Sequence, residues 1–177
     1  SFDYDTLVLS PGAKPFVPPT EGLDSVDHVF TLRNIPDVDK INAFLEIKKP
    51  RNAIVVGAGF IGLEMAENLS NKGLAVTVVE KSPQVLGPLD EEMSAFAYNE
   101  LKRNKVDLHL NTSIIEIKAN KAVLEDGSEL DADMIIMSIG VAPESQLAKD
   151  AGLKLGMRDG IIVDEKYQTS KDHIYAV

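Results

Sequence analysis

Cysteine is absent from all 177 residues. Its absence excludes a thiol nucleophile, a disulfide relay and a thiolate metal site within this chain, and it fits a reducing compartment such as the cytoplasm. The three histidines, His28, His109 and His173, are scattered without a second ligand at metal spacing. We therefore expect no metal site.

Basic residues are few beside acidic ones, at 18 Lys and Arg against 28 Asp and Glu, and the formal net charge is −10. Such a charge repels polyphosphates, which argues against nucleic-acid and anionic-membrane partners. No apolar run approaches the about 18 residues that a membrane-spanning helix needs. The composition therefore indicates a soluble globular protein, which we expect in the cytoplasm.

The start of the chain, Ser1-Phe2-Asp3-Tyr4-Asp5, has no initiator Met, basic segment or apolar signal core. We therefore expect a piece cut from a longer polypeptide, and no signal peptide at this end. The length suffices for one ordinary domain together with parts of a neighbour.

A strand, turn, helix and strand follow one another in the first half of the chain. The apolar run 52–56 leads into a glycine cluster, the helical pattern 63–69 follows, and Gly73 ends that helix. Residues 75–80 are almost continuously apolar, as in a parallel strand buried on both faces. The next helix and strand are expected at 90–104 and 106–110. Together they predict the βαβαβ half of a dinucleotide-binding fold.

Shorter elements are expected on both sides of this unit. Residues 5–10 predict a strand, the four prolines of 11–19 an extended linker, and 34–49 a helix capped by Asn34. After the unit we expect a β-meander at 114–118, 121–124 and 129–130, a strand at 133–139, a helix at 144–151, and strands at 160–163 and 174–177.

The glycine cluster has the spacing of a dinucleotide-binding turn. Gly57 permits the tight turn, Gly59 leaves room for a pyrophosphate, and Gly62 lets the helix pack closely. The pattern alone is weak, but here it lies between a predicted strand and a predicted helix. Because a helix N-terminus carries partial positive charge and free N–H groups, it can hold the phosphates without a basic side chain.

Glu80 ends the second strand of this unit and can accept hydrogen bonds from ribose hydroxyls. Its charge would repel the 2′-phosphate of NADPH, so we expect NADH to be preferred. Lys81 favours NADPH instead, because its ammonium group could turn towards the 2′-phosphate, so NADPH remains an alternative cofactor. Two further residues stay undecided, because Phe60 can pack or contact a cofactor and Glu64 can be an ordinary exposed helix residue.

The sequence resembles the flavoprotein pyridine nucleotide-disulfide oxidoreductases, in particular the coenzyme A disulfide reductase, NADH oxidase and NADH peroxidase group. The resemblance covers almost the whole chain. The segments that carry it are 4–13, 32–37, 57–64, 79–80, 138–144, 168–170 and 174–177.

The resemblance implies an α/β fold, namely a Rossmann-like three-layer NAD(P)-binding domain with a β-meander, plus edge segments of a truncated FAD domain. On this view residues 1–20 are the outgoing FAD-domain edge and 21–50 a linker and helix. Residues 51–159 would be the NAD(H)-binding domain and 160–177 the returning FAD-domain edge.

The resemblance also implies roles for individual residues. Phe60 would be an aromatic gate between nicotinamide and flavin, Ile61 and Gly140 would line the nicotinamide pocket, and Glu64 would lie near the nicotinamide amide. The residues expected to approach FAD are Ser10, Pro11 and Gly12.

In such enzymes the redox cysteine and the first FAD-binding glycines lie upstream of the matching region, and the dimerisation domain lies downstream. We therefore expect no catalytic residue in these 177 residues and no turnover by this chain alone. Its expected partners are the remaining FAD and dimerisation domains, within a homodimer.

The resulting hypothesis is an NADH-binding domain that delivers hydride from NADH to FAD in a coenzyme A disulfide reductase or an NADH oxidase or peroxidase. Two alternatives remain open. One is a non-catalytic NADH-sensing module, and the other is a ferredoxin reductase-type flavoprotein without a redox cysteine.

Overall fold

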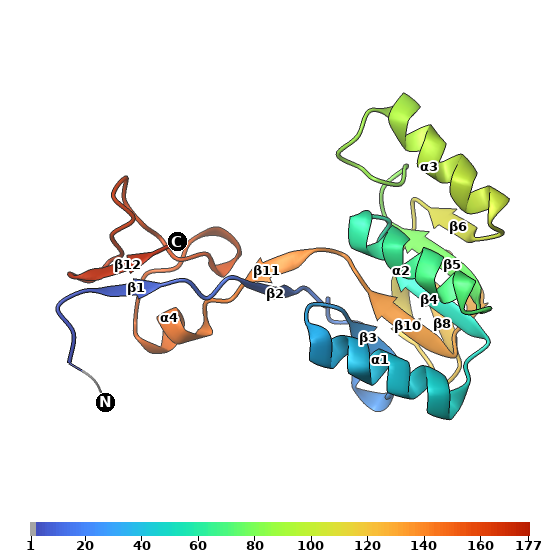
Figure 1. Cartoon of the computed structure of the whole chain (residues 1–177), viewed down its shortest axis with the longest axis horizontal. Coiled ribbons are helices and arrows are strands. Elements are labelled where there is room, and N and C mark those ends of the chain that lie inside the picture. Colours follow the sequence, from blue (N-terminus) through green and yellow to red (C-terminus); the bar gives the residue numbers. More distant parts are fainter. Residues whose placement is uncertain (1–2) are drawn as a thin grey trace. The chain divides into compact units, whose positions relative to one another are not determined.

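The computed structural model describes residues 3–177, and residues 1–2 of the expected FAD-domain edge lie outside them. The chain forms two compact units (Figure 1). Unit 1 combines the N-terminal segment up to Lys14 with Val141–Val177, and unit 2 is Pro15–Gly140.

Unit 2 is built on a parallel five-stranded sheet of order β3-β10-β4-β5-β6 (Figure 1). Its central strands are apolar and β-branched, and side chains such as Ile54, Val55 and Val78 are fully buried. This burial explains why the strands form near-continuous apolar runs. The strands are β3 (Val29–Thr31), β4 (Asn52–Val56), β5 (Ala75–Glu80), β6 (Asp107–Leu110) and β10 (Met134–Met137).

Three helices contribute to the core on one face of this sheet. They are α1 (Ile35–Lys48), α2 (Phe60–Asn71) and α3 (Glu91–Arg103). Ile41, Leu69 and Leu101, one from each helix, belong to the same buried cluster as Val55 and Val78. The predicted cap of α1 at Asn34 is confirmed, and the structure adds a reciprocal capping box with Asp37.

A β-meander covers the other face of the sheet. Its strands are β7 (Ile114–Ile117), β8 (Lys121–Leu124) and β9 (Glu129–Asp131). Ile117 and Leu124 pack with Ile54 and Ile135 of the sheet in a second buried cluster. The prediction of a three-layer Rossmann-like domain with a meander in place of the second helix layer is therefore confirmed.

The register of the sheet brings three strand ends to one edge. Val56 of β4 pairs with Val79 of β5 on one side and with Met137 of β10 on the other. Because the strands are parallel, the residues that follow them meet at the same carboxyl edge. The glycine cluster, Glu80 and the segment after β10 lie at this edge.

Unit 1 is small, and its strand β1 pairs in parallel with β12. Leu9, Ala148 and Ile174 lie in its own buried cluster. A second strand pair joins β2 to β11. The elements are β1 (Leu7–Leu9), β2 (Ala13–Pro15), β11 (Val141–Pro143), α4 (Gln146–Asp150), the 3₁₀ turn η2 (Met157–Asp159) and β12 (Ile174–Ala176).

Some predicted elements were wrong or incomplete. Residues 160–163 form no strand, because only Ile161 makes an isolated bridge, to Leu155. The segment 21–50 is more than a linker and a helix, since it also contains the 3₁₀ turn η1 (Leu23–Ser25) and the edge strand β3. The proline-rich linker likewise contains β2. The two compact units divide near residues 14 and 140, and the domain boundaries expected at residues 20, 50 and 159 stay a prediction.

Within the described residues, every helix is too short or too polar to span a lipid bilayer.

Candidate dinucleotide-binding site

The turn after β4 depends on glycine at its first position. Gly57 has a φ of +100°, a left-handed conformation that other residues rarely adopt. A Cβ atom at this position would lie 2.6 Å from the carbonyl oxygen of Ser138. The Gly57 N–H donates to the carbonyl oxygen of Val79 at 2.8 Å. The predicted tight turn at Gly57 is present and is held against both neighbouring strands.

The other two glycines differ in what surrounds them. At Gly62, on α2, a Cβ atom would collide with the carbonyl oxygen of Gly57 and lie 2.8 Å from the Ser138 hydroxyl. At Gly59, which has a φ of −80°, a Cβ atom would meet nothing within 4 Å. Gly62 is therefore needed for packing, whereas the space beside Gly59 is open to a ligand.

The Glu80 carboxylate connects the end of β5 to the glycine turn. One oxygen accepts the N–H of Ala58 and the other accepts the N–H of Ser82, each at 2.7 Å. An ionised carboxylate has about four acceptor positions, so each oxygen keeps capacity for a further donor. Glu80 therefore stands beside the turn with capacity to accept hydroxyl groups, as its predicted role requires.

Ser138, directly after β10, also belongs to this edge of the sheet. Its hydroxyl donates to the carbonyl oxygen of Val56 at 2.9 Å, and its N–H donates to the same oxygen at 2.8 Å. Sequence reasoning assigned Ser138 no role. Its position directly after a parallel strand was the available signal, because such residues gather at the carboxyl edge of the sheet.

The remaining predicted NADH residues surround this turn. Phe60 and Ile61 form the first residues of α2, and their side chains are 65% and 51% exposed. Lys81 is exposed directly after Glu80. Gly140, with a φ of +100°, is also exposed, and it follows Ile139, whose side chain approaches Gly57.

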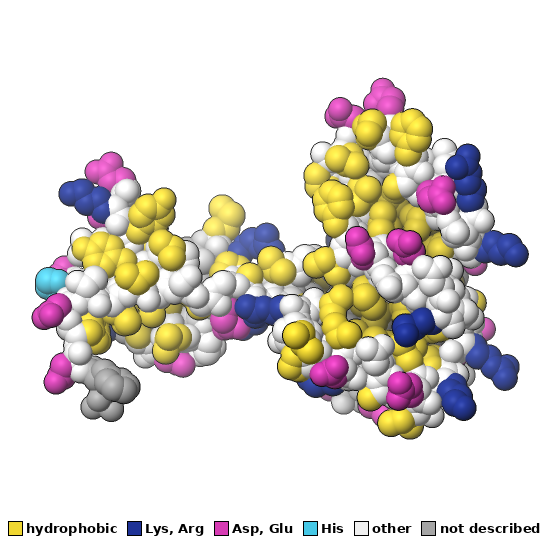
Figure 2. All heavy atoms as spheres, in the orientation of Figure 1, with side chains coloured by type: hydrophobic (Ala, Val, Ile, Leu, Met, Phe, Trp, Pro, Cys, Tyr) yellow, Lys and Arg dark blue, Asp and Glu magenta, His cyan; other side chains and the backbone are white. Residues whose placement is uncertain are grey.

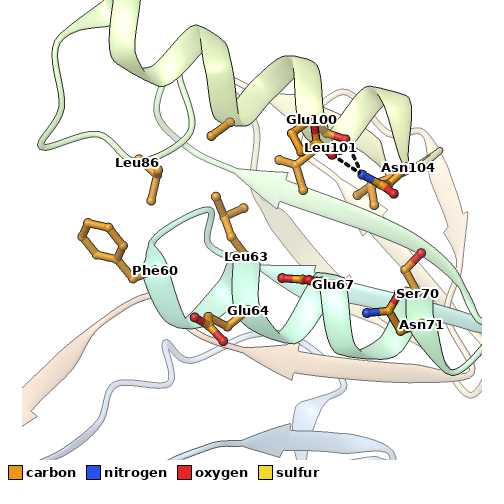
Figure 3. Close-up of a pocket in the computed structure, with 12 residues that line it drawn as sticks. Phe60, Leu63, Glu64, Glu67, Ser70, Asn71, Leu86, Glu100, Leu101 and Asn104 are labelled. Carbon is orange, nitrogen blue, oxygen red and sulfur yellow. Dashed lines mark hydrogen bonds between the residues drawn. The ribbon is translucent and has the colours of Figure 1, made fainter.

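A groove of about 420 Å³ lies between α2 and α3 and begins beside the turn (Figure 3). Phe60, Leu63 and Leu86 line its apolar part. Phe60 therefore has apolar residues as neighbours in this groove. Three carboxylates, from Glu64, Glu67 and Glu100, also line it. These charges repel phosphate, so the groove itself is poorly suited to a pyrophosphate.

The N-terminus of α2 is suited to an anionic group. Gly59 is the N-cap and has no side chain to accept the first N–H groups of the helix. No acidic residue lies in the first turn. Free N–H groups, the positive end of the helix dipole and the open space beside Gly59 together fit a pyrophosphate.

The predicted FAD-edge residues lie in unit 1. Ser10 is exposed directly after β1, followed by Pro11 and by Gly12, whose φ is +70°. The carbonyl oxygen of Gly12 accepts the N–H of Glu144 at 2.9 Å. Lys14 and Glu144 form an ion pair at 3.4 Å, which further joins the N-terminal segment of unit 1 to its C-terminal segment.

Residues 1–177 match the family model described as pyridine nucleotide-disulphide oxidoreductase. The chain belongs to this family. Its members are flavin-dependent oxidoreductases that use NADH or NADPH, which confirms the resemblance seen in the sequence.

Relatives match the chain over almost its full length. A NADH oxidase of Methanocaldococcus jannaschii is 45% identical over 99% of this chain and 40% of its own. A coenzyme A disulfide reductase of Staphylococcus haemolyticus is 36% identical over 98% of this chain and 39% of its own. The structure of reduced Bacillus anthracis CoADR-RHD is 49% identical, with a TM-score of 0.91, over 98% of this chain and 32% of its own. The chain thus spans about 40% of the length of the curated relatives.

Three further structures bear on function. A ferredoxin reductase from Rhodopseudomonas palustris is 32% identical, with a TM-score of 0.88, over 99% of this chain and 44% of its own. A water-forming NADH oxidase of Lactobacillus brevis bound to NADH and its engineered NADPH-bound variant are both 27% identical, with TM-scores of 0.84, over 99% of this chain and 39% of theirs.

The engineered variant differs from the NADH oxidase at five positions. A Gly became Ala and, 18 positions later, an Asp became Ala. The residues after that Asp changed from Ala to Arg and from Met to Ser, and a later Pro became Arg.

Proposed function

We propose that unit 2 binds NADH at the glycine turn and that the whole protein transfers hydride from NADH to FAD. The observation that carries this proposal is the Glu80 carboxylate, which lies against the turn and keeps capacity for ribose hydroxyls. Phe60, Ile61, Glu64 and Gly140 are proposed for the nicotinamide end. The protein would supply binding and orientation, and the cofactors would supply the redox chemistry.

The preference for NADH over NADPH is supported by the two related oxidases. Their altered Gly and Asp are 18 positions apart, as are Gly62 and Glu80. On this spacing Glu80 stands where the NADH oxidase has Asp and its NADPH-using variant has Ala. A carboxylate at this position accepts ribose hydroxyls but repels a 2′-phosphate, so it selects NADH.

The FAD site is proposed to include Ser10, Pro11 and Gly12 of unit 1, completed by polypeptide outside these 177 residues. We propose that the whole protein is a cytoplasmic homodimer whose remaining parts contribute the other FAD contacts, a redox cysteine and a dimerisation domain. Electrons would then pass from FAD to that cysteine and to an acceptor such as a disulfide, peroxide or oxygen.

Calorimetric titration of the chain with NADH tests the proposal. We expect binding that weakens by at least about tenfold in Gly59→Ala, because the new methyl group would occupy the open space beside the turn. Gly127→Ala is a control for an added methyl group away from the site: it strains the backbone at a φ of +83° in the turn between β8 and β9, but its Cβ atom would meet no neighbour, so NADH binding should not change. Absence of heat from the unsubstituted chain even at millimolar NADH would refute the proposal.

A ferredoxin reductase-type flavoprotein is the second candidate, favoured by the similarity to the Rhodopseudomonas palustris structure. It would keep NADH and FAD but lack a redox cysteine. Thiol titration of the full-length, NADH-reduced protein separates the two, because only a disulfide oxidoreductase would expose a new thiol on reduction.

A further inference from the structure

A cavity of about 370 Å³ lies in unit 2 at the edge of the sheet opposite the glycine turn. His28, Arg51 and Asp133 line it, and they directly precede β3, β4 and β10. Because these strands are parallel, the residues before them meet at the amino edge of the sheet. Small-molecule sites have volumes of roughly 300–1,000 Å³, so this cavity has room for a small ligand.

His28 is the buried polar side chain of this cavity. It is 5% exposed, and its Nε2 atom has no hydrogen-bond partner among residues 3–177. Buried polar atoms in native proteins normally have a partner, whether from the protein or from a bound molecule. The unpaired Nε2 atom therefore points to a hydrogen-bonding group that the protein itself does not supply.

Three cations line the cavity, and two of them are free to bind a ligand. The ammonium group of Lys48 lies 3.9 Å from an oxygen of Asp27, whereas Lys49 and Arg51 form no ion pair within the described part of the chain. Figure 2 shows dark blue side chains at the end of α1 from which the chain enters β4. The helix dipole favours cations at this end but leaves their charges uncompensated.

The two carboxylates of the cavity already have partners. Asp27 has Lys48, and one oxygen of Asp133 accepts the N–H groups of Arg51 and Asn52 at 2.9 Å and the side-chain amide of Asn52 at 3.2 Å. Among residues 3–177, no group of three His, Asp or Glu side chains could hold a metal ion. The uncompensated charges of the cavity are therefore positive, and an anion fits them better than a cation.

Phe44 and Pro50 add an apolar part to the lining. The ring of Phe44 packs edge-on against Phe30, with a distance of 5.0 Å between the ring centroids, so its position is fixed by the core. A ligand with an anionic end and a small organic part would use both the cations and this apolar part.

We propose that this cavity binds a small phosphate monoester, with Lys49 and Arg51 as cationic contacts for the phosphate and the His28 ring as a hydrogen-bond donor. A guanidinium group can bind two phosphate oxygens at once, and an ammonium group adds a point charge. The site lies at the opposite edge of the sheet from the glycine turn and does not depend on dinucleotide binding there.

Nuclear magnetic resonance titration of the isotope-labelled chain with glycerol phosphate, in the absence of nucleotide, tests the site. We expect saturable shifts in the signals of the His28 ring and of Arg51, with smaller shifts at Gly57 and Gly59. Inorganic phosphate at the same ionic strength should bind more weakly, because it cannot use the apolar lining. Equal affinity for the two would overturn the monoester as the ligand.

Two substitutions remove the cationic contacts without removing the fold. Arg51→Ala should raise the Kd about tenfold, and it keeps the main-chain N–H that Asp133 accepts. Lys49→Ala should raise the Kd about fivefold. Lys40→Ala is the charge-matched control, since Lys40 is exposed on the same helix and does not line the cavity. It should change the Kd by less than about twofold.

The outcomes separate this inference from the proposed function. Shifts confined to the glycine turn, an unchanged His28 ring signal, or equal losses in Arg51→Ala and Lys40→Ala would overturn the phosphate site. Titration of the same sample with NADH tests the dinucleotide site on its own. A chain that binds glycerol phosphate at His28 but does not bind NADH would refute the proposed function and leave this inference standing.

Discussion

The hydroxyl of Ser138 donates to the carbonyl oxygen of Val56 at 2.9 Å and thereby joins the end of β10 to the end of β4 beside the glycine turn. The Ser138 N–H donates to the same oxygen, so the carbonyl group keeps a partner when the hydroxyl is removed. Ser138→Ala should therefore lower the free energy of unfolding by only about 1 kcal/mol.

Urea unfolding followed by circular dichroism measures this change. Ser113→Ala is the control, because the Ser113 hydroxyl bonds an exposed carboxylate, Glu125, away from the turn, and its loss should cost less. If both variants lost the same free energy of unfolding, the Ser138 hydroxyl would stabilise the protein no more than the exposed Ser113 hydroxyl does, which would contradict the prediction.

Gly62→Ala should destabilise unit 2, because its methyl group would collide with the carbonyl oxygen of Gly57. Overpacking of this kind costs about 1–3 kcal/mol, and the displaced turn should also bind NADH more weakly. Gly73→Ala strains the backbone at a φ of +89° but meets no neighbour. A thermal-unfolding comparison should therefore show a smaller loss for Gly73→Ala, and NADH affinity should fall only in Gly62→Ala.

Asp133 stabilises the amino ends of β4 and β10. One of its oxygens accepts the N–H groups of Arg51 and Asn52, each at 2.9 Å, and these bonds to Asn52 and Arg51 lower the pKa of the carboxyl group. Because the pKa is lower in the folded state, Asp133 adds its full contribution to the free energy of unfolding above the ordinary pKa of 3.8. That contribution is lost as the pH falls through the pKa of the folded state.

Asp133→Ala should lower the free energy of unfolding by about 2 kcal/mol at neutral pH, since charged hydrogen bonds to backbone are lost. The difference from the unsubstituted chain should shrink below about pH 4, which urea unfolding at several pH values would show. A difference that stays constant down to pH 2 would contradict this assignment.

His28 predicts a separate pH dependence at higher pH. Its side chain is 5% exposed, and its Nε2 atom has no hydrogen-bond partner among residues 3–177. Burial lowers its pKa below the ordinary 6.5, although Asp27 and Asp133 oppose this shift. The folded state therefore favours the neutral ring, and stability should fall as pH drops below about 6.5.

Unfolding measurements between pH 5 and 7.5 test this expectation. The free energy of unfolding should change by no more than about 1.4 kcal/mol per pH unit, because one proton is involved. Replacement by a side chain that cannot be protonated, His28→Leu, should flatten the profile over this range. An unchanged slope in the variant would assign the pH dependence to another group.

Much of unit 2 could be predicted because its strands and helices carry strong local patterns. The run 75–80 is β5 itself, and the helix expected over 90–104 is α3 with Asp90 as its N-cap. Strand β3 escaped prediction because it has only three residues and is defined by its pairing with β10. The opposite error occurred at 160–163, where apolar residues favour a strand but find only one bridge partner.

The candidate site was also predictable only in part. The positions of Gly57, Gly62 and Glu80 followed from the spacing of one motif. The contacts of Glu80 with Ala58 and of Ser138 with Val56 could not be predicted, because they join residues 22 and 82 positions apart that meet only when the sheet forms. Local patterns thus located the site, and strand pairing determined its hydrogen bonds.

The N–H of Phe16 donates to the carbonyl oxygen of Gly140 at 2.9 Å, at the two ends of unit 2. A polypeptide that begins and ends at one place can be inserted into a loop of a host protein without stretching it. Residues 15–140 are therefore suited to insertion as one unit into a loop of another protein. A circular permutant that joins residues 15 and 140 by a short linker should also keep the sheet of unit 2.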